Sequence, residues 1–221
     1  MTQAAQTIDK KIALIMYLRG EGIQDQAVLN AIETIPREEF IPDSLKPQAW
    51  EDTALPIGRG QTISQPFIVA AMTEALDLSD QDKVLEIGTG CGYQAAVLSK
   101  LCRRVYTIER HKPLHEEALI RLEGLGLRNI TAICADGMQG WPTIHGIDQA
   151  PFDKIIVTAA ARAQPPPALI EQLKPGGIMV MPIGERGNQM LKLFRKETEQ
   201  TYTVQDLMPV RFVPLLPEVE N

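Results

Sequence analysis

The sequence predicts an α/β fold, with a doubly wound, mainly parallel sheet and helices on both of its faces. From residue 83 onward, apolar stretches rich in β-branched residues alternate with helical patterns, and this alternation requires right-handed crossovers between parallel strands. The apolar run at residues 84–87 breaks into a glycine-rich turn. A second apolar run ends in the carboxylate of Glu109, 21 residues after Gly88, which is the spacing of a nucleotide-binding unit.

The first 57 residues are expected to form a helical lead-in that packs on the core. Residues 7–19 and 24–35 have helical patterns, and Pro36 ends the second helix. Residues 36–56 contain four prolines and follow no steady period, so irregular chain is expected there. With 221 residues in all, we expect the lead-in at 1–57 and one principal domain at 58–221.

The principal domain is expected to alternate strands and helices in a regular order. An amphipathic helix follows Pro66, and a shorter helix opens at residues 165–167 and runs to Leu173. A turn at 174–177 then leads to a strand at 178–182. Strands are predicted at 83–87, 104–108, 130–134 and 152–158, with 155–157 central, helices at 92–101 and 112–125, and an antiparallel hairpin at 189–194 and 202–207.

The glycine turn indicates a cofactor site. Gly88, Gly90 and Gly92 lack Cβ atoms, so the backbone can adopt positive φ and approach a ligand closely. Tyr93 stands where a pyrophosphate-binding turn has its third glycine. This favours a cofactor without a pyrophosphate, such as S-adenosylmethionine, over NAD. Three glycines also suit an ordinary turn, so the pattern alone leaves both interpretations open.

Two acidic residues support the cofactor interpretation. A carboxylate about 20 residues after the first glycine usually accepts hydrogen bonds from ribose hydroxyls, and Glu109 has this position. Asp136 follows the strand predicted at 130–134 and suits an adenine amino group. The alternative for Glu109 is a solvated strand end.

Composition limits the classes of partner and compartment. The formal net charge of −6 and the pI near 5.2 disfavour nonspecific binding to nucleic acid or to an anionic membrane. No apolar run is long enough to cross a membrane, and the N-terminus lacks signal-peptide features. Three widely spaced cysteines and three histidines provide no metal-binding motif. We therefore expect a cytoplasmic protein without a metal site.

A polar loop at residues 58–66 precedes the amphipathic helix and allows two interpretations. Ser64, followed by Gln65 and Pro66, has the properties of an N-cap whose hydroxyl accepts a backbone N–H. Alternatively, the loop folds over the glycine turn and presents Thr62 and Ser64 to the acceptor of a transferred group.

The chain resembles the protein-L-isoaspartate O-methyltransferase family along nearly its whole length. The most specific element is Gln-Thr-Ile-Ser at residues 61–64, because other methyltransferases share the glycine turn but not this loop. Further matches in order and spacing occur at residues 36–42, 84–94, 105–109, 155–160, 173–177 and 210–215. The resemblance implies a class I S-adenosylmethionine-dependent methyltransferase fold with a C-terminal antiparallel hairpin.

The resemblance also implies an activity and roles for particular residues. The methyl group of S-adenosylmethionine passes to the free carboxylate of L-isoaspartyl residues in damaged proteins and peptides, and the ester closes to a succinimide. Ser64 corresponds to the active-site serine. By the same resemblance, Gly88, Gly90 and Gly92 hold the methionine and sugar portion of the cofactor, and Thr62 and Ile63 lie where the loop approaches cofactor and substrate. Glu109 with Arg110 contacts the ribose, and Asp136 with Gly137 contacts the adenine. A monomer is expected.

Some positions depart from the family pattern. Cys91 replaces a frequent serine, Ala135 a common glycine, and Arg59 an apolar residue. Loops at 143–149 and 162–167 are enlarged, and we expect both near the cofactor edge. A methyltransferase for small molecules and a noncatalytic cofactor-binding protein remain alternatives.

Overall fold

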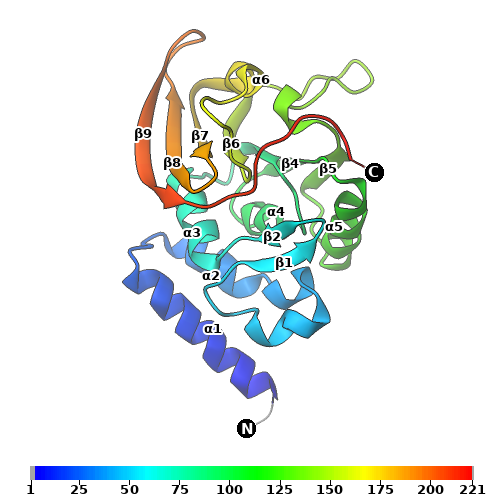
Figure 1. Ribbon diagram of the computed structural model, residues 1–221, viewed down its shortest axis with the longest axis vertical. Coiled ribbons are helices and arrows are strands. Elements are labelled where there is room, and N and C mark those ends of the chain that lie inside the picture. The colour runs from blue at the N-terminus through cyan, green and yellow to red at the C-terminus, as the bar shows by residue number, and fades with distance from the viewer. Residues whose placement is uncertain (1–2, 221) are drawn as a thin grey trace.

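The computed structural model describes residues 3–220, with side chains from residue 7 onward. Its centre is a seven-stranded sheet in the order β5-β4-β3-β6-β7-β8-β9 (Figure 1). The strands are β3 (Lys83–Ile87), β4 (Arg104–Glu109), β5 (Ile130–Cys134), β6 (Phe152–Val157), β7 (Leu173–Glu185), β8 (Asn188–Lys196) and β9 (Tyr202–Val210). The first five strands are mutually parallel, and β8 and β9 extend the sheet antiparallel. The predicted fold class and C-terminal hairpin are confirmed, and β6 occupies the centre as expected.

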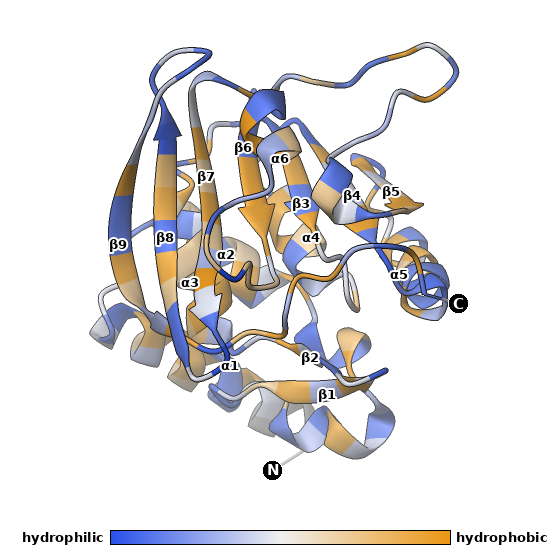
Figure 2. Cartoon of the chain, turned by 45° about the horizontal axis from the view of Figure 1, so that its top comes forward, coloured by the Kyte–Doolittle hydropathy of each residue, from blue (hydrophilic) through white to orange (hydrophobic). Residues whose placement is uncertain are grey.

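Two layers of helices cover the sheet, because alternate residues of each strand face opposite sides. In β7, Ile178 and Val180 belong to one buried cluster with Met72 of a covering helix, whereas Met179 belongs to the cluster on the other side with Leu169. The helices and short 3-10 turns are α1 (Gln3–Gly20), α2 (Gln26–Thr34), η1 (Arg37–Phe40), η2 (Asp43–Gln48), α3 (Pro66–Ala75), α4 (Tyr93–Ser99), α5 (Lys112–Gly124), η3 (Gly137–Gln139) and α6 (Pro167–Gln172). Figure 2 shows the apolar colouring concentrated on the central strands.

The helical lead-in packs against the core and is continuous with it. Leu18 of α1, Ile32 of α2 and Ala96 of α4 are all fully buried in one cluster. The expected boundary between residues 57 and 58 falls inside β1 (Leu55–Gly58), which pairs antiparallel with β2 (Gln61–Ile63). This small hairpin was expected to be loop. It connects the lead-in to the carboxyl edge of the main sheet.

Two local predictions were wrong. Residues 174–177, expected as a turn before a strand, lie inside β7 as a bulge, because Leu173 pairs with Phe152 and the pairing resumes at Ile178. The loop at 143–149 does not lie at the cofactor edge. Gln149 accepts hydrogen bonds from Lys83 and Tyr106, so this loop ends at the amino edge of the strands, and Figure 1 shows it opposite β1 and β2.

Candidate active site

A cavity of about 280 Å³ opens at the carboxyl edge of the parallel strands. Its walls come from the β1–β2 hairpin, the glycine turn after β3, the end of β4 and the chain that follows β9. Figure 1 shows this last segment crossing in front of the sheet towards α5. Eight of the ten predicted site residues line the cavity: Thr62, Ile63, Ser64, Gly88, Gly90, Glu109, Arg110 and Gly137. Gly92 and Asp136 are not among its lining residues.

The glycine turn exposes backbone to the cavity. Gly88 has φ +97° and Gly90 has φ +55°, conformations that side chains with a Cβ rarely adopt. A Cβ on Gly88 would overlap with the Oγ1 atom of Thr158, which itself donates to the Gly88 carbonyl at 2.7 Å. Gly92 acts differently. It precedes α4 with φ +95°, a conformation that favours glycine, and a Cβ there would stand in ordinary contact with Leu122 of α5 at 3.4 Å.

Glu109 is held in one orientation by two backbone N–H groups. Its Oε2 accepts from Gly90 at 2.8 Å and its Oε1 from His111 at 2.9 Å. The residue is only 4% exposed but lines the cavity. Each carboxylate oxygen retains a further lone pair. A ligand with neighbouring hydroxyls, such as a ribose, therefore finds a fixed acceptor at this point.

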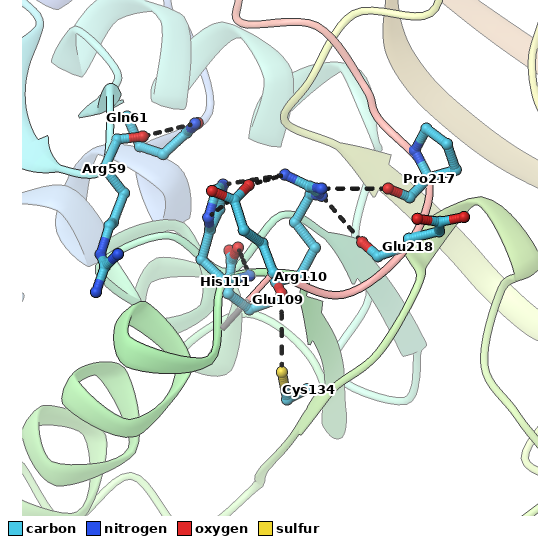
Figure 3. Close-up of polar contacts among 9 residues, drawn as sticks. Arg59, Gln61, Glu109, Arg110, His111, Cys134, Pro217 and Glu218 are labelled. Atoms are coloured by element: carbon cyan, nitrogen blue, oxygen red, sulfur yellow. Dashed lines mark hydrogen bonds and ion pairs between the residues drawn. The ribbon is translucent and has the colours of Figure 1, made fainter.

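Arg110 contacts the C-terminal segment (Figure 3). Its guanidinium donates to the carbonyls of Pro217 at 3.2 Å and Glu218 at 3.0 Å, and its Nη1 lies 2.7 Å from Glu220 Oε2. These contacts fasten the end of the chain beside Glu109. Arg110 also lines the cavity, and its contact with the ribose stays a prediction.

Of the two residues predicted to contact the adenine, Gly137 lines the cavity and Asp136 does not. The Oδ1 of Asp136 accepts the N–H of Met138 at 2.9 Å and so caps η3. Gly137 is buried and lines the cavity, and a Cβ there would overlap with Ile87. The glycine therefore allows the backbone before η3 to pack directly against Ile87 at the end of β3.

Ser64 follows β2 and faces the cavity, and its predicted alternative role as a helix cap is wrong. The N-cap of α3 is Gln65, whose side chain makes no capping bond. The free N–H of Phe67 is instead bound by Asp52 Oδ1 at 2.7 Å. A carboxylate from the preceding loop thus replaces the hydroxyl, which leaves the Ser64 hydroxyl without a capping role.

Sequence reasoning gave no role to Arg37, which lies beneath this loop with 0% of its surface exposed. Its Nη2 donates to the Ser64 carbonyl at 2.7 Å and to the Thr53 carbonyl at 3.3 Å. Its guanidinium lies 4.9 Å from the ring centroid of Tyr93, and burial lowers the pKa of Arg37. Arg37 therefore links the Ser64 loop to the first residue of the helix after the glycine turn. The available signal was an arginine within the matching segment 36–42.

The segment after β9 is the second part of the site that sequence reasoning left without a role. The Val213 carbonyl accepts from the N–H of Ala160, and the N–H of Leu215 donates to the Ala160 carbonyl, each at 2.8 Å. Residues 213–216 line the cavity. The match at residues 210–215 was the only signal in the sequence.

A buried carboxyl group lies under the glycine turn. Glu86 is 0% exposed and accepts from Thr107 Oγ1 at 2.5 Å, and the Oγ1 atoms of Thr107 and Thr89 are 2.6 Å apart. Desolvation, assisted by the charge of Glu109, raises the pKa of Glu86 to about 8 against the opposing bond from Thr107. At neutral pH this carboxyl group is mainly protonated, so it can be buried without an ion pair.

The glycine turn, the oriented acid at the end of β4 and the cavity at the carboxyl edge define a class I S-adenosylmethionine-dependent methyltransferase. The model of the protein-L-isoaspartate(D-aspartate) O-methyltransferase family matches residues 9–220. The chain belongs to that family.

Similar proteins cover most of the chain. The protein-L-isoaspartate O-methyltransferase of Rhodospirillum centenum is 55% identical over 213 residues, which are 96% of this chain and 94% of that protein. The corresponding protein of Parvibaculum lavamentivorans is 56% identical over 211 residues, covering 94% of this chain and 91% of that protein.

Solved structures have the same fold. A protein-L-isoaspartate O-methyltransferase matches with a TM-score of 0.80 and 31% identity over 92% of this chain, which spans 65% of that longer chain. A homologue from Plasmodium falciparum, solved in complex with S-adenosyl-L-homocysteine, matches with a TM-score of 0.78 and 24% identity, covering 92% of this chain and 97% of that one. The predicted family, enzyme class and cofactor are confirmed. No helix among residues 3–220 is long and apolar enough to cross a membrane.

Proposed function

We propose that this protein methylates the free carboxylate of L-isoaspartyl residues in proteins and peptides, with Ser64 orienting the acceptor. The observation that carries the assignment is one cavity that joins the glycine turn to the Gln-Thr-Ile-Ser segment. The glycine turn suits the cofactor. The Gln-Thr-Ile-Ser segment belongs to the loop that distinguishes this family in sequence.

The residues that line the cavity fit S-adenosylmethionine. Gly88 and Gly90 offer bare backbone, Glu109 offers carboxylate oxygens to hydroxyl groups, and Gly137 contributes a wall without a side chain. When bound, S-adenosylmethionine supplies an electrophilic methyl group on a positively charged sulfur. The buried position of Glu109 strengthens its hydrogen bonds to a ligand because water competes less there.

The acceptor needs no catalytic base. A carboxyl group with a pKa near 4 is ionised at neutral pH, so the protein has only to orient it and remove its water. Alignment of two reacting groups can contribute on the order of 7 to 11 kcal/mol. The Ser64 hydroxyl would donate to the carboxylate and fix one oxygen in place. The resulting ester closes to a succinimide without further help from the protein.

The expected partners are isoaspartyl-containing proteins and peptides, and we place the reaction in the cytoplasm. Three separate cysteines, all free in the structure, suit a reducing compartment. The net charge of −6 disfavours nucleic-acid and anionic-membrane partners. A monomer is the default expectation.

The test is methyl transfer to matched peptides. The protein is incubated with S-adenosylmethionine carrying a labelled methyl group and two peptides that differ only in L-isoaspartate or normal aspartate. Base-labile label on the isoaspartyl peptide alone is the expected result. No label on either peptide, with cofactor binding shown by calorimetry, would refute the acceptor and direct the search to small molecules or to a binding role.

A further inference from the structure

A second, smaller cavity of about 50 Å³ adjoins the acceptor side of the main one. The two cavities share Thr62, Ser64, Thr158 and Val213 in their walls. A group in the small cavity would therefore lie next to an acceptor at Ser64, and none of the three glycines of the turn lines this cavity. The small cavity also has one charged wall residue, Arg211.

The backbone that carries Arg211 is fixed from two sides. Gln189 of β8 is only 6% exposed, and its side-chain amide accepts the Phe212 N–H at 2.6 Å and donates to the Phe212 carbonyl at 3.1 Å. The next residue, Val213, is bound by Ala160. The position of Arg211 beside Ser64 is therefore set by paired backbone, although the side chain itself is exposed.

The charge of Arg211 is not neutralised within the protein. Over residues 3–220 its guanidinium has no hydrogen bond and no acidic partner within ion-pair distance. By contrast, Arg110, which follows β4 and contacts the far end of the same segment, is paired with Glu220. In a chain with a net charge of −6, an unpaired cation at the wall of a cavity is a binding group for an anion.

The anion is not the acceptor carboxylate itself. That carboxylate loses its negative charge on methylation, so a cation bound directly to it would stabilise the substrate more than the transition state. A carboxylate that does not react can remain bound throughout. Because Ser64 lines the small cavity, a carboxylate bound there would lie beside the acceptor.

We propose, on the basis of the function proposed above, that Arg211 and the small cavity form a specificity subsite for a second, non-reacting carboxylate of the isoaspartyl substrate. That carboxylate comes from an acidic side chain flanking the isoaspartyl residue or from the C-terminus of the peptide. The enzyme then prefers acidic neighbours. An arginine suits this task because its planar fork binds carboxylates in two-point fashion.

The test measures kcat and KM on isoaspartyl peptides with blocked ends that differ in one flanking residue, Glu, Gln or Lys, on either side. One further peptide has Gln flanks and a free C-terminus directly after them. The wild-type protein should favour a carboxylate-bearing peptide over the blocked Gln peptide by roughly fivefold in KM, the scale of an exposed ion pair. In Arg211→Ala this ratio should fall to about one, and in Arg211→Glu the Lys peptide should become the preferred substrate.

Controls separate the subsite from other causes. Arg195 is exposed on β8, opposite Ile178 and away from both cavities, so Arg195→Ala removes the same charge and should leave the preference unchanged. Preference for the free C-terminus alone would identify the chain end as the bound group. An equal loss on all peptides in Arg211→Ala, or no change in the ratio, would overturn the subsite. Failure of the blocked Gln peptide to be methylated by the wild-type protein would instead count against the proposed function.

Discussion

Replacement of Arg37 by methionine tests how the Ser64 loop is held. The buried guanidinium donates to the Ser64 and Thr53 carbonyls at 2.7 and 3.3 Å and lies 4.9 Å from the Tyr93 ring. Methionine has a similar length but no donor. The substitution therefore leaves both carbonyls without this partner while largely filling the space.

The expected loss of stability is smaller than the number of lost contacts suggests. Each hydrogen bond from a charged donor contributes about 1.5 to 3 kcal/mol. Against this, the guanidinium is 0% exposed, and its Nε and Nη1 atoms have no hydrogen-bond partner among residues 3–220. Removing a buried, partly unsatisfied charge recovers part of the loss, so the free energy of unfolding should fall by about 2 kcal/mol or less.

Catalysis should suffer more than stability. Misplacement of a reacting group by about 1 Å can reduce the rate 100-fold, so kcat/KM of Arg37→Met should fall roughly 10- to 100-fold. Cofactor affinity should change little, because Arg37 contacts neither Gly88 nor Glu109, the residues expected to bind the cofactor. Arg37→Lys, which keeps the charge and a donating nitrogen, should recover part of the activity.

The assay combines urea unfolding, calorimetric binding of S-adenosylmethionine and kinetics on an isoaspartyl peptide. Measurements at low temperature ensure that the variant is folded. Unchanged kcat/KM in a folded Arg37→Met protein would refute the positioning role. Loss of cofactor affinity equal to the loss of kcat/KM would instead show that Arg37 acts through the glycine turn.

Three further predictions concern the same site. Ser64→Ala should lower methyl transfer at least tenfold with little change in cofactor affinity or stability, since Asp52 caps α3; unchanged transfer, measured with a labelled methyl group, would contradict the role of the hydroxyl. Gly88→Ala should lower the free energy of unfolding in urea by about 2 to 4 kcal/mol, because of the φ of +97° and the overlap with Thr158. Thr158→Ala in the same protein should remove the overlap and recover part of the loss, so strictly additive losses would argue against the overlap. Burial raises the pKa of Glu86 from 4.5 to about 8. Between these pH values the folded state binds a proton that the unfolded state has lost, so stability should fall as pH rises from about 4.5 through 8. Glu86→Gln should flatten this dependence between about pH 5.5 and 9, and an equal slope in both proteins would contradict the raised pKa.

Local rules in the sequence determined the fold class and the cofactor side of the site. Strand and helix periodicity is a property of neighbouring residues, so the order of strands and helices from Lys83 to Cys134 followed directly. The positions of Gly88, Gly90 and Glu109 also followed, because the carboxyl ends of adjacent parallel strands meet at one edge. The family resemblance added the Ser64 loop, and the structure brings that loop to the same cavity.

Only the tertiary structure decided which side chains satisfy one another across the chain. Ser64 has the sequence of a cap, yet Asp52 binds the helix end, because a carboxylate from another loop competes for the same N–H. Arg110 follows Glu109 in sequence but is bound by Glu220, 110 residues later. Arg37 begins the short helix η1 and Arg211 directly follows β9. Burial beneath one loop and exposure beside a cavity give these two arginines different roles. Such contacts depend on long-range packing, which no local pattern of residues encodes.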